Sequence, residues 1–261
     1  MNIATPDLIR TLKVDRLTVE VYRSPDDVAL AASRMASEIL KAALVRQSEI
    51  RVIFATGRSQ KQCLSYLTNH LPQNIWRSVI GFHLDEYLGI AASHPASFRH
   101  YFKERLLSKV SMKDFYEIEG DTLLPMEMCE RYERELRSHS IDLCFLGVGN
   151  NGHLAFNDPG VTDLNDPRWV KLVRLDEQNR QQQAGSTAFP TLQAVPQYAF
   201  TLTLSAIGSA CHSLCLAFGE HKADIVNTLL TKPISPACPA SVLRRFPSAT
   251  LLVDAAAAAN L

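Results

Sequence analysis

The segment over residues 141–160, IDLCFLGVGNNGHLAFNDPG, constrains the fold more than any other part of the chain. It opens with an apolar run over 141–148, whose length and content of Ile, Leu, Val and Phe are typical of a buried strand in a parallel sheet. The run ends in Gly149-Asn150-Asn151-Gly152, and glycine and asparagine tolerate the positive φ angles of sharp turns. We therefore expect a strand that enters a tight loop at the carboxyl edge of a sheet.

Polar side chains follow that turn directly. His153, Asn157 and Asp158 are interleaved with apolar residues, and Pro159-Gly160 closes the segment. In open α/β sheets, ligands bind outside the carboxyl ends of the strands, so an imidazole and a carboxylate at this place form a candidate site. Taken alone, the segment is equally compatible with an ordinary turn that carries a structural histidine.

The remaining chain alternates between strand and helix patterns. Further strands are expected at 17–22, 50–55, 78–84, 115–119, 169–175, 199–204, 213–218 and 249–253, and helices at 24–43, 60–70, 95–107, 125–138, 220–230 and 240–246. Such alternation predicts βαβ units and an α/β fold with a mostly parallel sheet that helices cover on both faces. No linker or composition shift divides the chain, so we expect a single domain over 1–261.

Composition argues against several classes of partner. Lys plus Arg and Asp plus Glu both number 27, so the balance of charge gives no indication of binding to nucleic acid or to an anionic membrane. No apolar run approaches the roughly 20 residues of a membrane-spanning helix, and the amino-terminal stretch lacks the pattern of a secretory signal. The six cysteines are scattered and form no zinc pattern, which favours reduced thiols in a cytoplasmic protein.

Two loops that precede this segment in the chain carry further candidate site residues. Thr56-Gly57-Arg58-Ser59 stands between a strand and a helix, where unpaired N–H groups and the positive end of the helix dipole favour phosphate. The alternative is that Ser59 merely caps the helix. Asp85 and Glu86 follow the next strand, where a carboxylate shielded from water becomes a useful base. The alternative for this pair is two solvated acids.

Taken together and in this order, four motifs resemble the glucosamine-6-phosphate deaminase (isomerase) family. They are ATGRS, LDEYLG, GVGNNGHLAFNDPG and GEHKA, spread over about residues 52–227. The related 6-phosphogluconolactonases typically have GHTASLFPG and DER in place of GHLAFNDPG and DEY, so both differences favour the deaminase branch.

The resemblance implies a modified Rossmann-like sheet and an enzyme of amino-sugar metabolism, including N-acetylglucosamine catabolism, without cofactor or metal. The implied reaction converts an amino-sugar 6-phosphate and water into a ketohexose 6-phosphate and ammonia. By motif, Asp85 matches the base that removes the C2 proton, and His153 matches the residue that opens the pyranose ring. Asn151 and Asp158 match the residues that orient His153. The phosphate positions correspond to Gly57, Ser59 and Lys222, with Thr56 and Arg58 as further donors.

The sequence departs from the family pattern at three places. Asn151 stands where Asp is frequent, and Asp158 replaces the usual Glu. The phosphate-binding arginine of the family has no clear counterpart near 183–189, which leaves Arg58 or Arg180 as substitutes.

Several alternatives stay open at this level. A lactonase-type esterase and a non-catalytic sugar-phosphate sensor are the rival functions, and the gluco or galacto epimer of the substrate is not determined. A homo-oligomer is compatible with the resemblance, because family members range from monomers to hexamers. Residues 161–197 form either a mobile lid or a fixed surface excursion.

Overall fold

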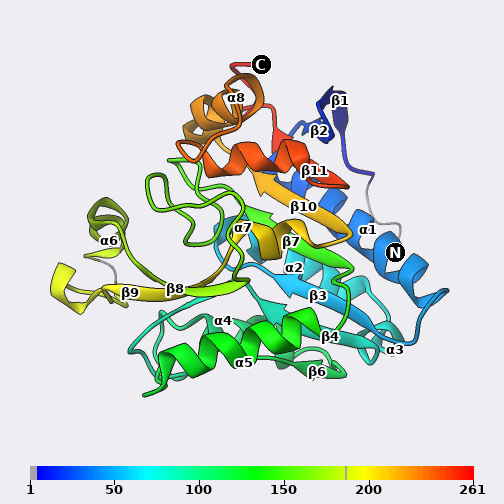
Figure 1. Ribbon diagram of the computed structural model, residues 1–261. Helices are drawn as coiled ribbons and strands as arrows, with labels where there is room; N and C mark the ends of the chain where they lie inside the picture. Colours follow the sequence, from blue (N-terminus) through cyan, green and yellow to red (C-terminus); the bar gives the residue numbers. More distant parts are fainter. Residues whose placement is uncertain (1–4, 186) are drawn as a thin grey trace.

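A twisted eight-stranded sheet forms the centre of the molecule (Figure 1). The computed structural model describes residues 5–185 and 187–261. The strand order is β1-β2-β11-β10-β7-β3-β4-β6, and every neighbouring pair is parallel except β1 and β2. The strands are β1 (Leu8–Val14), β2 (Leu17–Tyr22), β3 (Ile50–Phe54), β4 (Val79–His83), β6 (Asp114–Phe115), β7 (Leu143–Gly147), β10 (His212–Ala217) and β11 (Ala249–Asp254). The predicted α/β class and mostly parallel sheet are confirmed.

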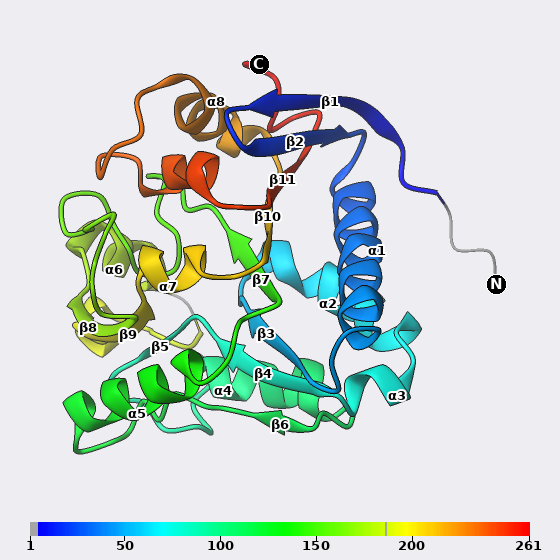
Figure 2. The ribbon, with the colours of Figure 1, turned by 45° about the vertical axis from the view of Figure 1, so that its right-hand side comes forward.

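Helices lie on both sides of this sheet. In Figure 2, α1 and α2 lie on one side of β7, and α7 lies on the other side. The helices are α1 (Pro25–Leu44), α2 (Arg58–His70), α3 (Gln73–Trp76), α4 (Phe98–Phe102), α5 (Pro125–Arg137), α6 (Glu177–Gln183), α7 (Leu204–Gly208) and α8 (Ala223–Thr231). Shorter turns are the π-helical η1 (Lys103–Leu107) and the 3₁₀ segments η2 (Leu192–Ala194), η3 (Glu220–Lys222) and η4 (Pro239–Arg245).

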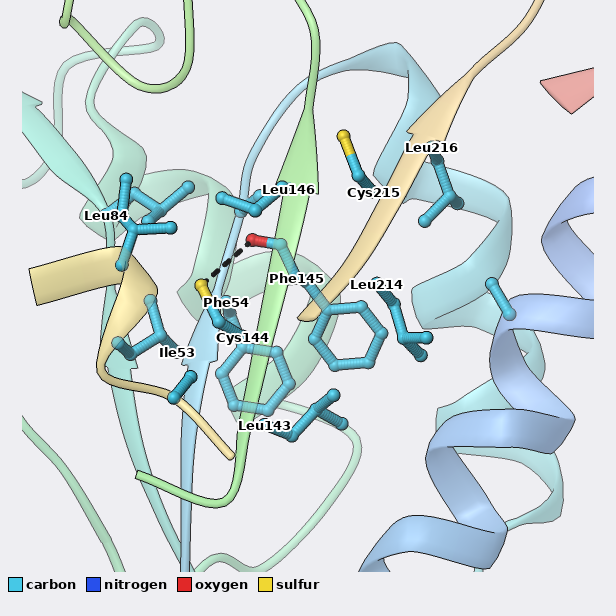
Figure 3. Packing of buried hydrophobic residues seen from close by; sticks show 14 of the residues in the cluster. Ile53, Phe54, Leu84, Leu143, Cys144, Phe145, Leu146, Leu214, Cys215 and Leu216 are labelled. Atoms are coloured by element: carbon cyan, nitrogen blue, oxygen red, sulfur yellow. Dashed lines mark hydrogen bonds between the residues drawn. The ribbon is translucent and has the colours of Figure 1, made fainter. Parts of the chain in front are cut away.

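The core is built where β7 runs between β3 and β10. Most side chains of these strands are apolar, and Figure 3 shows such residues packed around β7. Phe54 and Phe145 stack with their ring centroids 5.7 Å apart. Because both faces are buried, these strands are predominantly apolar, and this packing fixes their carboxyl ends at one edge of the sheet. The cysteines are all free thiols, and every one is buried except Cys211.

A second, smaller sheet was not predicted. Strands β5 (Asp85–Tyr87), β9 (Tyr198–Leu202) and β8 (Val170–Arg174) form an antiparallel sheet in the order β5-β9-β8. The expectation that 85–87 is a loop is therefore wrong, as is the placing of 169–175 and 199–204 in one main sheet. The chain leaves the main sheet at Leu84, whose carbonyl accepts the N–H of Leu202 at 2.8 Å. Three residues are too few for a periodic signal, which explains the error.

Smaller differences have local causes. The edge strand β1 went unpredicted because most of its side chains are exposed, so no apolar face marks it. The helix expected from Pro95 begins at Phe98 and continues as η1. In the part of the chain that the structure describes, no helix has both the length and the apolar character needed to cross a bilayer.

Candidate active site

A cavity of about 730 Å³ opens where β3, β4 and β7 end. Its walls include the loop after β3, the start of β5, and the loop after β7, so that Ser59, Asp85 and His153 all line it. Segments far apart in the chain thus meet at one edge of the sheet, as the sequence predicted. Cavities of about 300–1,000 Å³ are the usual size for small-molecule sites, and a sugar phosphate fits this range.

The amino terminus of α2 forms one end of the cavity. Gly57 is its N-cap residue with φ 102°, no side chain caps the helix, and its first turn holds no acidic residue. Ser59 lies inside the helix, so the alternative that it is the cap is wrong. Thr56, Gly57, Arg58 and Ser59 all line the cavity. The uncapped N–H groups and the helix dipole therefore present an anion site to the cavity.

Asp85 supplies the carboxylate of the site. It is the first residue of β5 and only 8% of its surface is exposed, although it lines the cavity. Burial, and then the negative charge of Glu86, raise the pKa of Asp85 to about 8. A carboxyl group whose pKa lies near the working pH is well matched to accept and return a proton.

Glu86 does not share this role. It is fully buried, and its carboxylate accepts four hydrogen bonds at 2.7–3.1 Å. One comes from the backbone N–H of Tyr87 in β5, and three come from the start of α4: the hydroxyl of Ser97 and the backbone N–H groups of Phe98 and Arg99. Glu86 therefore fixes α4 against β5. The family resemblance had singled out Asp85, and the structure separates its carboxyl group in the cavity from the structural one of Glu86.

His83 holds the backbone of Asp85, and sequence reasoning missed it. Its Nε2 accepts the N–H of Ile118 at 2.8 Å, so Nδ1 carries the proton and donates to the Asp85 carbonyl at 2.8 Å. Burial lowers the pKa of His83 to about 3, which keeps the ring neutral. A fully buried histidine beside this acidic motif has no sequence signature of its own.

His153 is held by the two residues that the sequence singled out. Its Nδ1 lies 3.1 Å from Oδ1 of Asp158, which is buried. Asn151 donates from Nδ2 to the same carboxylate oxygen at 2.9 Å, and its Oδ1 accepts the N–H of His153 at 3.1 Å. The shorter Asp158 side chain thus still reaches the imidazole. Because Nδ1 faces Asp158, Nε2 is the nitrogen left to exchange protons with a ligand.

Lys222 lies beside the cavity and is absent from its lining residues. Its ammonium group donates to the carbonyl of Val148 at 2.7 Å and to Oδ1 of Asn150 at 2.5 Å. Burial, and then the charge of Arg58, lower its pKa. Lys222 therefore braces the loop that carries His153 and adds positive charge next to Arg58.

Three aromatic side chains form a further wall of the cavity, and this aromatic wall was not predicted from the sequence. Tyr87 lies 5.4 Å from Phe156 and 5.5 Å from Phe189 between ring centroids, and all three line the cavity. Phe189 is 2% exposed and belongs to a second hydrophobic cluster with Val195. This packing favours a fixed excursion over a mobile lid for its part of residues 161–197.

Among the described residues, no group of three or more His, Cys, Asp or Glu side chains is placed to hold a metal ion.

Comparisons with known proteins agree with this geometry. Residues 23–252 match the family model described as glucosamine-6-phosphate isomerases/6-phosphogluconolactonase. The chain belongs to this family. A glucosamine-6-phosphate deaminase of Listeria monocytogenes is 33% identical over 232 residues, which cover 89% of this chain and 96% of that protein.

Solved structures of the glucosamine-6-phosphate isomerase/6-phosphogluconolactonase family share the fold. A monomeric glucosamine-6-phosphate deaminase superposes with a TM-score of 0.85 at 29% identity, covering 93% of this chain and 99% of that one. A 6-phosphogluconolactonase of Trypanosoma brucei reaches 0.77 at 21% identity, covering 97% and 100%, a likeness that concerns the fold alone. The resemblance noted in the sequence is confirmed.

Gly149 allows the imidazole of this family member its close approach. A Cβ atom at this position would lie 2.2–2.4 Å from atoms of the His153 ring. We expect Gly149→Ala to displace the ring and to lower kcat by about 100-fold, because misplacement of about 1 Å has this effect on catalysis. Steady-state kinetics beside a thermal melt check this; an unchanged kcat in a folded variant would contradict it.

Burial of Asp85 also predicts a stability effect. Since its folded-state pKa is about 8 against an ordinary 3.8, the folded protein holds a proton that the unfolded chain releases, and stability falls as pH rises through that window. The Asp85→Asn variant has no titrating carboxyl group at this position, so its stability does not fall with pH for this reason. We expect its free energy of unfolding to gain about 3–4 kcal/mol relative to the native protein between pH 5 and pH 8. Urea titrations at the two pH values measure this, and a constant difference would contradict the raised pKa.

Proposed function

We propose that this protein is an aldose–ketose isomerase/deaminase acting on glucosamine 6-phosphate or galactosamine 6-phosphate. Water is the second substrate, and the products are a ketohexose 6-phosphate and ammonia. One observation carries the proposal: Asp85 and His153 line the same cavity as the uncapped amino terminus of α2. The relatives named glucosamine-6-phosphate deaminase support it, at 33% identity over 89% of the chain.

The phosphate group binds first in this account. The N–H groups at the start of α2, with Thr56, Ser59 and Arg58, hold the dianion, and Lys222 adds charge from behind the β7 loop. Anchoring at C6 fixes the sugar relative to the walls. Positioning of this kind converts binding energy into orientation of the reacting carbon.

Ring opening is the task of His153. Its Nε2 takes the proton of the O1 hydroxyl and delivers it to O5 as the C1–O5 bond breaks, which yields the open-chain aldehyde. Imidazole suits this transfer because it both accepts and donates protons near neutral pH. Asp158 and Asn151 are positioning residues, since their contacts fix the ring and they are absent from the cavity lining.

Deamination then starts at C2. The Asp85 carboxylate removes the C2 proton, and the C2–H electrons form the C1–C2 double bond of an enolamine while the C2 ammonium group of the substrate gives a proton to O1. Returning a proton to C1 leaves an imine at C2. Water adds to this imine and ammonia leaves, so the atoms balance as aminohexose phosphate plus water to ketohexose phosphate plus ammonia.

The whole chain, residues 1–261, belongs to this one deaminase-like domain in our proposal. The described helices are compatible with a cytoplasmic enzyme of amino-sugar and N-acetylglucosamine catabolism, acting alone or as a homo-oligomer. No cofactor is required by the chemistry above.

Ammonia release tests the proposal. The purified protein is incubated with glucosamine 6-phosphate, its galacto epimer and 6-phosphogluconolactone, and ammonia and lactone hydrolysis are measured. We expect ammonia from at least one epimer. Hydrolysis of the lactone without ammonia would support the esterase, and sugar-phosphate binding without either product would support the sensor.

A further inference from the structure

The cavity is strongly positive at the end formed by α2. Arg58 and Lys61 of α2 line it, and so does Arg105 of η1, while Lys222 lies next to Arg58. Among the described lining residues, Asp85 is the one carboxylate. In this cluster Arg105 and Lys222 are half-buried and Arg58 and Lys61 are exposed, and such a concentration of cations at a cavity is suited to a phosphate dianion.

Arg105 lies on the α4–η1 helix, for which no role in the site was predicted from the sequence. Phe98, Tyr101 and Arg105 are spaced as one face of the continuous α4–η1 helix, and all three line the cavity. On the adjoining face, Phe102 and Leu106 are fully buried in the core and hold the helix in place. The position of Arg105 at the cavity is therefore fixed by packing.

The guanidinium group of Arg105 is free to bind a ligand. It lies over the ring of Tyr101, 5.3 Å from the centroid, and within the described part of the chain it makes no hydrogen bond or ion pair. Burial raises the pKa of Tyr101 to about 12, so the ring beneath the cation is neutral. Stacking restricts the guanidinium and leaves its in-plane N–H donors unused, an arrangement that suits bidentate binding of phosphate.

Arg180, the other substitute that the sequence offered, is occupied elsewhere. Its Nε donates to the carbonyl of Pro196 at 3.2 Å, and one Nη donates to the carbonyls of Leu192 and Val195 at 3.0 and 2.9 Å. Arg180 therefore stabilises the turn at η2, and these bonds would have to break before it turned to a ligand.

We propose that Arg105 binds the phosphoryl group of the substrate together with Arg58, in place of the arginine missing near 183–189. The inference rests on the proposed function for the identity of the ligand. It assigns phosphate recognition to two segments, the start of α2 and the α4–η1 helix. The position of the phosphate group then depends on the α4–η1 helix. Hydrogen bonds of Glu86 connect this helix to β5, the strand that contains Asp85.

The test compares Arg105→Gln and Arg105→Lys with Lys103→Gln. Lys103 is exposed on the same helix and is not a lining residue, so it controls for loss of one charge. The probe is 2-amino-2-deoxyglucitol 6-phosphate, an unreactive open-chain analogue, with its unphosphorylated form as reference. We expect Arg105→Gln to weaken binding of the phosphorylated probe about 10- to 100-fold, and to leave binding of the reference unchanged. Arg105→Lys should fall between, and Lys103→Gln should bind as the native protein does.

Calorimetry on folded variants separates this inference from the proposed function. Equal binding of the phosphorylated probe by native protein and Arg105→Gln would overturn it, even if ammonia release is observed. An equal loss for phosphorylated and unphosphorylated probes would also overturn it, because the residue would then shape the cavity generally. A selective loss supports the inference even if no ammonia is released.

Discussion

Asp85→Asn is expected to lower kcat for ammonia release by at least about 1,000-fold, with little change in the affinity for the phosphorylated sugar. The amide has nearly the shape of the carboxyl group but accepts no proton at neutral pH, so the C2–H bond stays intact. Phosphate contacts at α2 do not involve Asp85 and should persist. Single-turnover ammonia assays and calorimetry with the unreactive glucitol 6-phosphate analogue measure the two quantities.

Asp114→Asn is the matched control for this variant. Asp114 is exposed and remote from the cavity lining, and its Oδ1 accepts the N–H of Phe115 at 2.8 Å, a bond that asparagine keeps. It should retain native kcat. Turnover by Asp85→Asn within about 10-fold of native would remove Asp85 from the role of base, because base catalysis contributes more than this.

His153→Gln is expected to slow the reaction of the ordinary substrate by about 100- to 1,000-fold. Glutamine can fill the space beside Asp158 but cannot shuttle a proton between O1 and O5. A 4,5-dideoxy analogue of the substrate lacks both O4 and O5, so it can form neither the furanose nor the pyranose ring. With this analogue we expect His153→Gln to lower the rate by less than about 10-fold, because no ring has to be opened by general acid–base catalysis.

The ratio of the two losses is the informative quantity. Native protein and His153→Gln are assayed with both substrates under the same conditions, and thermal melts establish that the variant is folded. An equal loss on the two substrates would contradict ring opening and would give His153 a role at C2 or in binding.

The sequence determined the parts of the site that lie in continuous motifs. The strand at 143–147 and the loop through His153 and Asp158 are local, because glycine, asparagine and apolar periodicity specify them over a few residues. What the sequence did not specify depends on distant packing. The assignment of 85–87 to a second sheet, and the structural role of Glu86, follow from contacts with β9 and α4.

Arg105 illustrates the same limit. In the sequence it is one of several charges on a helix, and nothing marks it as different from Lys103. Its place in the cavity follows from which face of that helix the core buries. The aromatic wall of Tyr87, Phe156 and Phe189 is likewise assembled from three separate segments.

The fate of the C2 hydrogen tests the central claim most directly. Glucosamine 6-phosphate labelled with deuterium at C2 is incubated with the native protein and with Asp85→Asn, and loss of label from C2 is followed beside ammonia release. The account predicts that the native protein removes deuterium from C2 at least as fast as ammonia appears, and that Asp85→Asn does neither. Ammonia released while the label stays on C2, or label lost at the native rate in Asp85→Asn, would contradict it.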